Sequence, residues 1–386
     1  MTRPHILPMA FSIPTQVVFG EGVSRQAGPI AKGLGAQRVF AVTDAGVAKA
    51  GILDPAFASV REAGLALAVF DQAPLDPTLD DAQRIGEAAR SFGTDLVIAA
   101  GGGSGLCSGR SAAVAATNGD LHACTGHEKY ANDPLPVIAI PTTAGSGSEV
   151  SKHLTLTDER TGRKTGIDGY TNAPRVALLD PTLVQGVPQQ VAVASGIDAF
   201  LHALEAYLST RATPLTDAIA LDAFERIWRL LPQALAGDAR AKGDMLFASS
   251  MANVACGNAG LTLVHAMNGG VTYCFKARGH APVAYGMIHG ALMPPILRFF
   301  VPAAADRFAR LAPMVGVASG DPAAVVERIV DWARACGAPP KLPWGRIPDA
   351  DVDLIVEETL ARKRPSPRQP TREEARAIVL EALGVA

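Results

Sequence analysis

The chain has 386 residues, of which 48% are hydrophobic and 19% charged, with a formal net charge of −2. This length suggests about two domains, and the composition is that of a folded protein with a large core. No basic block marks a nucleic-acid or membrane surface, and no run of 18 apolar residues marks a membrane span. The five cysteines are scattered without a CxxC pair, which favours a reducing, cytoplasmic location over a disulfide framework.

Short apolar runs alternate with helical patterns up to about residue 180. β-Forming residues dominate 38–44 and 66–71, and two further apolar runs, 94–104 and 135–149, end in glycine, serine and threonine. Nearly continuous apolar strands that alternate with helices predict a parallel sheet covered on both faces. We therefore expect an α/β domain over residues 1–182.

Helical periodicity replaces this pattern after about Pro181. Segments such as DAIALDAFERIWRLL and DPAAVVERIVDWARA carry apolar residues at helical spacing, and the alternation typical of strands is nearly absent. We expect an all-helical domain over residues 183–386, with a ligand bound in the cleft between the two domains.

The sequence AAGGGSGLCSG joins a predicted strand to a predicted helix through three glycines. Glycine lets the backbone approach a phosphate closely, and a helix N-terminus offers free N–H groups. Leu106 breaks the GxGxxG fingerprint, so a purely structural turn is an equally good interpretation. Asp44 ends an earlier strand and could bind a ribose hydroxyl, although capping the next helix is the more common role for such a residue.

The stretch DAFLHALE places Asp198 and His202 four residues apart, on one face of a predicted helix. One carboxylate with imidazoles suits a divalent ion such as Fe, Zn or Mn, whereas a simple Asp–His hydrogen bond is the more common explanation for one pair. His265, His280 and His289 supply further imidazoles in largely apolar surroundings, where an imidazole needs a partner. Together they favour a metal site in the second domain.

The chain resembles the iron-containing (group III) alcohol dehydrogenase family over nearly its whole length, through motifs that occur in the family's order: FSIPTQVVFGEGV, GGGS, PTTAGSGSEV, ALLDPTLVQGVP, SGIDAFLHALEAYLS, LVHAMNG, LMPPILRF and SPRQPT. The resemblance implies a Rossmann-like α/β domain followed by a helical domain, the dehydroquinate synthase-like architecture. It also implies NAD and a divalent metal (Fe, alternatively Zn or Mn) in the cleft, interconversion of a small alcohol and its aldehyde or ketone, and a homodimer.

The resemblance also implies roles for individual residues. Asp198, His202 and His265 fall on metal-ligand positions, and Asp44 falls on the position associated with NAD rather than NADP. No catalytic residue is implied beyond the metal ligands. The other cofactor-contact positions are Gly102, Gly103, Ser104, Thr142, Thr143, Ser151 and Lys164.

Three positions depart from the family pattern. Cys107 and Arg110 stand where its glycine loop usually has Asp and Lys, and Gly269 stands where a His is common. These departures leave two other functions open. One is the reduction of an oxoacid or activated double bond, as in maleylacetate reductases. The other is a catalytically impaired relative that binds nucleotide.

The fourth metal ligand also departs from the family, because Tyr285 stands at the aligned place. A neutral phenol is a poor ligand for a divalent ion at neutral pH. His280 lies on an insertion that could fold toward the cleft, whereas His289 lies one helical turn beyond Tyr285, about 6 Å along the axis. We therefore expect His280 to be the fourth ligand, with His289, a water molecule or Tyr285 as alternatives.

Overall fold

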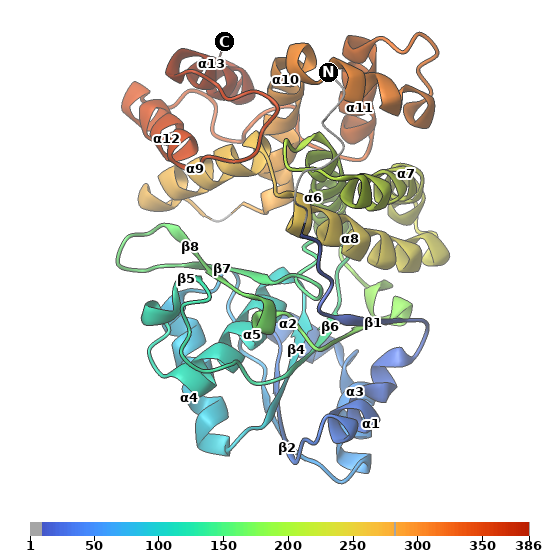
Figure 1. Ribbon diagram of the computed structural model, residues 1–386, viewed down its shortest axis with the longest axis vertical. Helices are drawn as coiled ribbons and strands as arrows, with labels where there is room; N and C mark the ends of the chain where they lie inside the picture. The colour runs from blue at the N-terminus through green and yellow to red at the C-terminus, as the bar shows by residue number, and fades with distance from the viewer. Residues whose placement is uncertain (1–9, 282, 386) are drawn as a thin grey trace.

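The computed structural model describes residues 10–281 and 283–385. An α/β domain occupies one end of the molecule and a helical domain the other (Figure 1). All six strands of the main sheet are parallel. In spatial order they are β1 (Gln16–Phe19), β9 (Val176–Leu179), β6 (Val137–Pro141), β4 (Leu96–Gly101), β2 (Arg38–Val42) and β3 (Ala66–Phe70).

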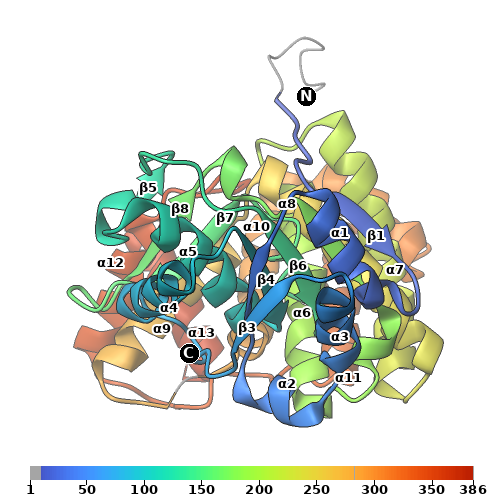
Figure 2. The ribbon, with the colours of Figure 1, turned by 90° about the horizontal axis from the view of Figure 1, so that it is seen from below.

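Helices cover both faces of this sheet (Figure 2). Leu96 and Ile98 of β4 pack on one face, whereas Val97 and Ala99 pack on the other, and all four side chains are fully buried. Because successive side chains of a strand point to opposite faces, a strand covered on both sides must be apolar throughout. One face carries α1 (Ala27–Gly33) and α3 (Asp54–Glu62), and the other carries α4 (Leu79–Phe92) and α5 (Gly103–Asn118).

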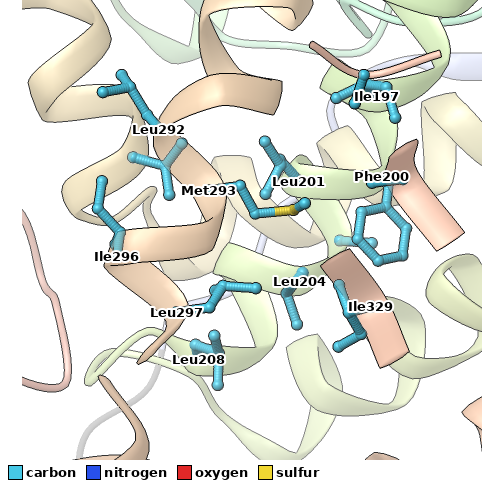
Figure 3. Close-up of a cluster of buried hydrophobic side chains, with 14 of the residues drawn as sticks. Ile197, Phe200, Leu201, Leu204, Leu208, Leu292, Met293, Ile296, Leu297 and Ile329 are labelled. Atoms are coloured by element: carbon cyan, nitrogen blue, oxygen red, sulfur yellow. The ribbon is translucent and has the colours of Figure 1, made fainter. Parts of the chain in front are cut away.

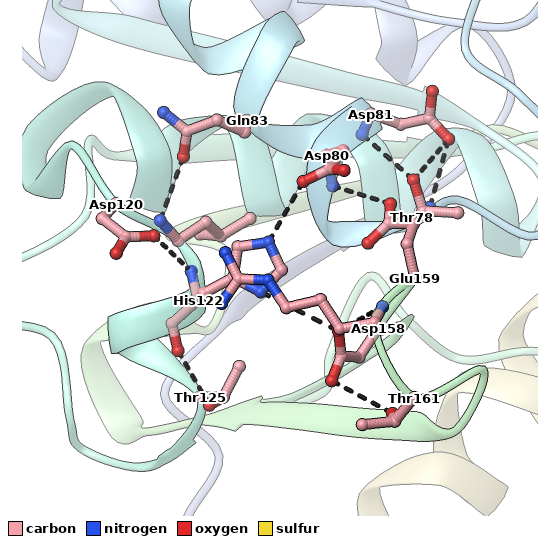
Figure 4. Close-up of polar contacts among 12 residues, drawn as sticks. Thr78, Asp80, Asp81, Gln83, Asp120, His122, Thr125, Asp158, Glu159 and Thr161 are labelled. Carbon is pink, nitrogen blue, oxygen red and sulfur yellow. Dashed lines mark hydrogen bonds and ion pairs between the residues drawn. The ribbon is translucent and has the colours of Figure 1, made fainter.

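A second, small sheet lies beside α5 and was not expected from the sequence. It contains β5 (Gly126–His127), β8 (Lys164–Asp168) and β7 (His153–Thr157), of which β7 and β8 form an antiparallel hairpin. The turn of this hairpin contacts the start of α4 and a 3₁₀ helix, η2 (His122–Cys124), through polar side chains (Figure 4). Three of them form what we call the surface cluster: Asp80, His122 and Glu159.

The second domain is helical, and within the described residues no strand follows β9. Its core includes Leu201 and Leu204 of α6, which pack with Leu292 and Ile296 of α10 (Figure 3). The helices are α6 (Gln189–Leu208), α7 (Pro214–Leu235), α8 (Ala239–Ala259), α9 (Leu263–Ala277), α10 (Tyr285–Val315), α11 (Pro322–Ala335), α12 (Asp349–Ala361) and α13 (Arg372–Leu383).

Two of these helices, α6 and α10, are long and apolar enough to cross a membrane by length and composition alone. Their most apolar windows are 78% and 67% buried inside the protein, so they are core helices of the second domain. The predicted parallel α/β domain followed by an all-helical domain is confirmed. The boundary after residue 182 falls inside the 3₁₀ helix η4 (Pro181–Val184) and stays a prediction.

Candidate metal and cofactor site

Two helices bring three of the proposed metal ligands together. Asp198 and His202 lie one turn apart on α6, and His265 lies in the first turn of α9. Asp198 Oδ1 is 3.8 Å from His202 Nε2 and 3.6 Å from His265 Nε2. One possible ligand atom from each residue lies within 4.8 Å of the others. A carboxylate and two imidazoles at these separations can share one divalent ion.

His289 of α10 lies directly against this group. Its side chain is fully buried, and its Nδ1 is 2.9 Å from Asp198 Oδ1. Its ring centroid is 4.1 Å from that of His265, and its Nε2 is 2.6 Å from the side-chain amide of Asn268, which holds the ring in place. We therefore propose His289 as the fourth ligand and define the metal cluster as Asp198, His202, His265 and His289.

His280 lies elsewhere, so our choice of this residue is corrected. It is exposed, and its ring packs 5.2 Å from Phe275 and 6.2 Å from Trp344. Helix α9 continues to Ala277, and His280 N donates to Phe275 O at 3.0 Å just after it, which holds His280 at the end of this helix. The expectation that one helical turn would carry His289 out of reach is also wrong, because α10 begins at Tyr285 and turns His289 toward Asp198.

Glu205 contacts the metal cluster through His265, and it was not identified from the sequence as a site residue. Its fully buried carboxylate accepts hydrogen bonds from His265 Nδ1 and from the backbone N–H of Thr262 and Val264. A carboxylate on Nδ1 fixes the proton there and leaves Nε2 free for a metal. The signal was present in DAFLHALE, since residue 205 follows residue 198 by seven and shares its helix face.

Buried polar atoms of the cluster have incomplete hydrogen bonding. Asp198 Oδ1, His202 Nδ1 and His289 Nδ1 make no hydrogen bond of good geometry in the described part of the chain, although Asp198 Oδ1 and His289 Nδ1 form an ion-pair contact at 2.9 Å. Leaving such atoms buried without a partner is costly, so native structures normally satisfy them. A bound cation would do so, and the donor set of one carboxylate and three imidazoles fits a divalent transition metal.

Burial and the charges of neighbouring groups set the pKa values of the cluster's side chains. Burial lowers the pKa of His202 to about 4, so its imidazole is neutral at pH 7, as a metal ligand must be. Burial alone would also lower the pKa of His265, but Glu205 and Asp198 raise it to about 9. Without metal, His265 is therefore protonated at neutral pH.

The glycine turn between β4 and α5 brings several cofactor candidates together. Gly101 has a φ of +129°, and the first helical hydrogen bond runs from Leu106 N to Gly102 O. The preceding N–H groups of the helix therefore have no helical acceptor and can bind an anion. Thr142 N donates to Gly101 O at 2.9 Å. A methyl group added to Gly102 would lie 3.4 Å from the Thr143 side chain, so these residues border one small space.

Asp44 caps a helix and also faces the glycine turn. One oxygen, Oδ1, caps helix α2 (Ala45–Ala50) by accepting from Gly46 N and Val47 N, each at 3.0 Å. The other oxygen, Oδ2, faces the glycine turn, 3.2 Å from where a methyl group on Gly101 would lie. The carboxylate therefore caps a helix and still offers one oxygen beside the turn.

Gly103 and Ser104 begin α5. A methyl group on Gly103 would lie 3.0 Å from Ser146 Cβ, which leaves no room for a side chain there. The Ser104 hydroxyl accepts a hydrogen bond from Asp76 N at 3.2 Å, so the side chain turns toward the loop before α4. Any contact of these two residues with a cofactor phosphate would therefore be made mainly by their backbone N–H groups.

Arg110, one of the departures from the family pattern, cross-links the loop that follows β6. Its side chain is fully buried, and burial lowers the pKa of Arg110 to about 10, so the guanidinium stays charged at pH 7. At 2.6–3.2 Å, it donates to the backbone carbonyl groups of Ser148, Ser151, His153 and Asn172. Ser151 also accepts from His153 N through its hydroxyl, so both of its polar groups are engaged within the loop.

Lys164 on β8 faces the helical domain. It forms an ion pair with Asp76, and its Nζ lies 5.5 Å from the centre of the Tyr285 ring. Lys276 of α9 reaches the same Asp76 carboxylate at 3.1 Å. Lys164, predicted to contact the cofactor, therefore lies where the two domains meet, and its positive charge is already paired with Asp76.

The chain was compared with known protein families and proteins. Residues 14–181 match the family described as iron-containing alcohol dehydrogenase, and residues 192–383 match the C-terminal region of the Fe-containing alcohol dehydrogenase family. The NAD-dependent methanol dehydrogenase of Bacillus methanolicus is 31% identical over 97% of this chain and 99% of its own length. The 1,3-propanediol dehydrogenase of Klebsiella pneumoniae is 33% identical over 96% of this chain and 98% of its own length.

Solved structures agree with this assignment. An alcohol dehydrogenase from Oenococcus oeni superposes with a TM-score of 0.90 at 29% identity, covering 97% of this chain and all of its own. The buried Asp and His residues lie within the matched C-terminal region. The chain belongs to the iron-containing alcohol dehydrogenase family and is an NAD-dependent oxidoreductase that interconverts alcohols and aldehydes.

Proposed function

We propose that the enzyme acts on a small alcohol and its aldehyde or ketone, with a divalent metal held by Asp198, His202, His265 and His289. One observation carries this proposal: a ring nitrogen of each of the three His residues lies within 3.8 Å of the same buried oxygen, Asp198 Oδ1. Iron is the first choice of metal, and zinc or manganese are alternatives, because imidazole and carboxylate ligands accept all three.

The protein's own residues hold and orient these groups. Glu205 keeps the proton of His265 on Nδ1, and Asn268 holds the His289 ring by its Nε2. When bound, the metal supplies Lewis acidity toward the substrate oxygen and the nicotinamide accepts or delivers hydride. His202 and His289 are 6% and 0% exposed, so bulk water has little access to this side of the metal cluster.

The test is metal content combined with turnover. Purified protein should hold about one divalent ion per chain and oxidise NADH with a panel of short aldehydes. His202→Ala should lose both metal and turnover, because an ion held by fewer ligands binds weakly. His202→Ala protein that retained a full complement of metal would contradict the proposed ligand set.

The cofactor preference is proposed from Asp44. Its free oxygen beside the glycine turn would accept from a ribose 2′-hydroxyl and repel a 2′-phosphate. Asp44→Ser tests this, since serine keeps the helix cap and removes the charge. We expect the ratio of kcat/KM with NADPH to that with NADH to rise about tenfold, or ~1.4 kcal/mol. An unchanged ratio would remove Asp44 from the cofactor site.

A homodimer in the cytoplasm is proposed as well. Strand β1 lies at the edge of the sheet and, among the described residues, pairs with β9 alone, so its outer side could pair with a second copy. Ile13 and Phe19, in and beside it, are 48% and 41% exposed. All five cysteines are buried free thiols, which suits a reducing compartment. A monomer by light scattering at micromolar concentration would contradict the dimer.

The alternative of an impaired relative is disfavoured by the metal cluster and by Arg110. The departures in the glycine loop are accommodated, because Arg110 makes hydrogen bonds that secure the loop. A maleylacetate reductase-like activity would reduce an oxoacid or an activated double bond instead. The same panel tests it, provided that an oxoacid and a compound with an activated double bond are included beside the aldehydes.

A further inference from the structure

An arginine fills the space beside Gly269, one helical turn from the metal cluster. Gly269 follows His265 by four residues on α9 and so lies on the same face, about 6 Å further along the axis. Arg362, just after α12, enters the space that a side chain at this position would take. A methyl group on Gly269 would lie 2.7 Å from Arg362 Cζ and 2.8 Å from its Nε.

The guanidinium of Arg362 has no partner among the described residues. Its Nε is buried without a hydrogen bond, and no carboxylate in that part of the chain lies within ion-pair distance. The nearby Glu358 is already paired with Arg163 at 2.7 Å. Burial lowers the pKa of Arg362, with Glu358 acting in the opposite direction. A partly buried cation without a counter-ion is costly, and a bound anion would offset that cost.

Arg362 lies on the side of α9 that carries the metal ligand His265, because it packs against Gly269, one turn further along the helix. Near the cluster, the Tyr285 ring centroid is 6.5 Å from that of His289, and Lys164 beside the Tyr285 ring is paired with Asp76. Arg362 is therefore a cation near the cluster that is still available to a ligand.

We propose that Arg362 binds an anionic group of the substrate, so that the enzyme acts on alcohols and aldehydes that carry a carboxylate or sulfonate. This inference rests on the proposed function. A guanidinium presents parallel N–H donors that match the two oxygens of such a group. With the reacting oxygen at the metal cluster, the anion would lie about one helical turn away, on the order of 6 Å.

The experiment compares two aldehydes of the same chain length, 4-oxobutanoate and butanal. For the wild type we expect kcat/KM to be higher with 4-oxobutanoate. Arg362→Met should lower kcat/KM for 4-oxobutanoate about 10- to 100-fold, the usual range for a lost charged hydrogen bond, and change butanal less than about twofold. Lys363→Met is the matched control, since it removes an exposed charge next in sequence and should change neither value.

A second variant and a binding measurement guard against a folding defect. Gly269→Ala keeps Arg362 but places a methyl group where its guanidinium lies, so it should reduce the preference for 4-oxobutanoate in the same direction. Calorimetric titration of the protein with succinate, in the absence of NAD, gives a readout without turnover. Succinate should bind the wild type and the Lys363→Met variant at least about tenfold more tightly than the Arg362→Met variant.

Failure of this inference is distinct from failure of the proposed function. Turnover of butanal without a preference for 4-oxobutanoate, and equal succinate binding by the wild type and the Arg362→Met variant, would overturn the role of Arg362 alone. An increase in the KM for NADH in Arg362→Met, equal with both aldehydes, would also overturn it, because the guanidinium would then serve the cofactor. No turnover of either aldehyde by metal-loaded wild type would contradict the proposed function itself.

Discussion

Within the described residues, Asp, His and Glu side chains approach one another closely at two places, the metal cluster and the surface cluster. At each place, ligand atoms of three residues lie within 4.8 Å of one another. In the surface cluster the atoms are engaged: His122 Nε2 lies 3.0 Å from Asp80 Oδ1, and Glu159 accepts from Asp80 N at 2.9 Å. Figure 4 shows these contacts.

The two clusters differ in solvent exposure. The Asp80 side chain is 71% exposed, whereas that of Asp198 is 15% exposed. Water competes for an exposed carboxylate and screens its charge, so proximity alone says little about an ion. In the metal cluster one buried carboxylate oxygen lies within 3.8 Å of three imidazoles, and this burial separates a proposed metal site from a network that holds the hairpin of β7 and β8 in place.

The largest effect is expected when His289 is removed. His289→Ala should weaken divalent-metal binding at least about 100-fold, roughly 2.7 kcal/mol, because it removes one of four ligands from a buried site. His280→Ala is the matched control and should bind metal like the wild type, since its ring lies on Phe275. Competition with a chelating dye measures both. Loss of affinity in the His280 variant alone would reverse our assignment.

A smaller effect is expected from Glu205, which acts through His265. Glu205→Gln should lower metal affinity about tenfold, the lower end for a residue that orients a ligand, since the amide oxygen can still accept from Nδ1. Glu149→Gln changes another buried glutamate, one that contacts Ser250, and should leave affinity unchanged. If both variants bound metal equally well, Glu205 would have only a structural role.

The pH dependence of metal binding follows from the ionisation of two ligands, His265 and His202. The pKa of His265 is raised to about 9, and that of His202 is lowered to about 4. Between pH 6.5 and 8.5 a metal must therefore displace one proton, from His265, and the apparent affinity should rise about tenfold for each pH unit. Titrations at three pH values in this range measure the slope. A flat profile would mean that His265 is neutral in the metal-free protein.

Some elements of the structure were predicted correctly from the sequence, and others were missed. Continuous apolar runs predicted β2 and β4, because a strand buried on both faces must be apolar throughout. The hairpin of β7 and β8 was missed, since its polar, half-exposed residues resemble a loop. Residue spacing gave the shared face of Asp198 and His202, but it does not reveal where α10 begins, and that start decides which way His289 points.

Contacts between segments that are far apart in the chain could not be predicted from the sequence. Nothing in the sequence around Gly269 indicates that Arg362 fills the adjacent space, because that contact depends on how α12 packs against α9. The role of Arg110 was unpredictable for the same reason, since its carbonyl partners come from a loop and from β7. Local periodicity predicts elements and faces, whereas partners across the fold depend on tertiary packing.

The smallest effect is expected at the surface cluster. If this cluster bound a metal ion as the metal cluster is proposed to, the distinction between the two would be wrong. His122→Ala should leave the metal content unchanged after dialysis into metal-free buffer, because exposed carboxylates hold an ion too weakly to survive it. The exposed contact with Asp80 should contribute no more than about 1 kcal/mol to stability, so the midpoint of thermal unfolding should shift only slightly. His202→Ala, measured in parallel, should lose its metal. A loss of one metal equivalent in His122→Ala instead would show that exposure does not separate the two clusters.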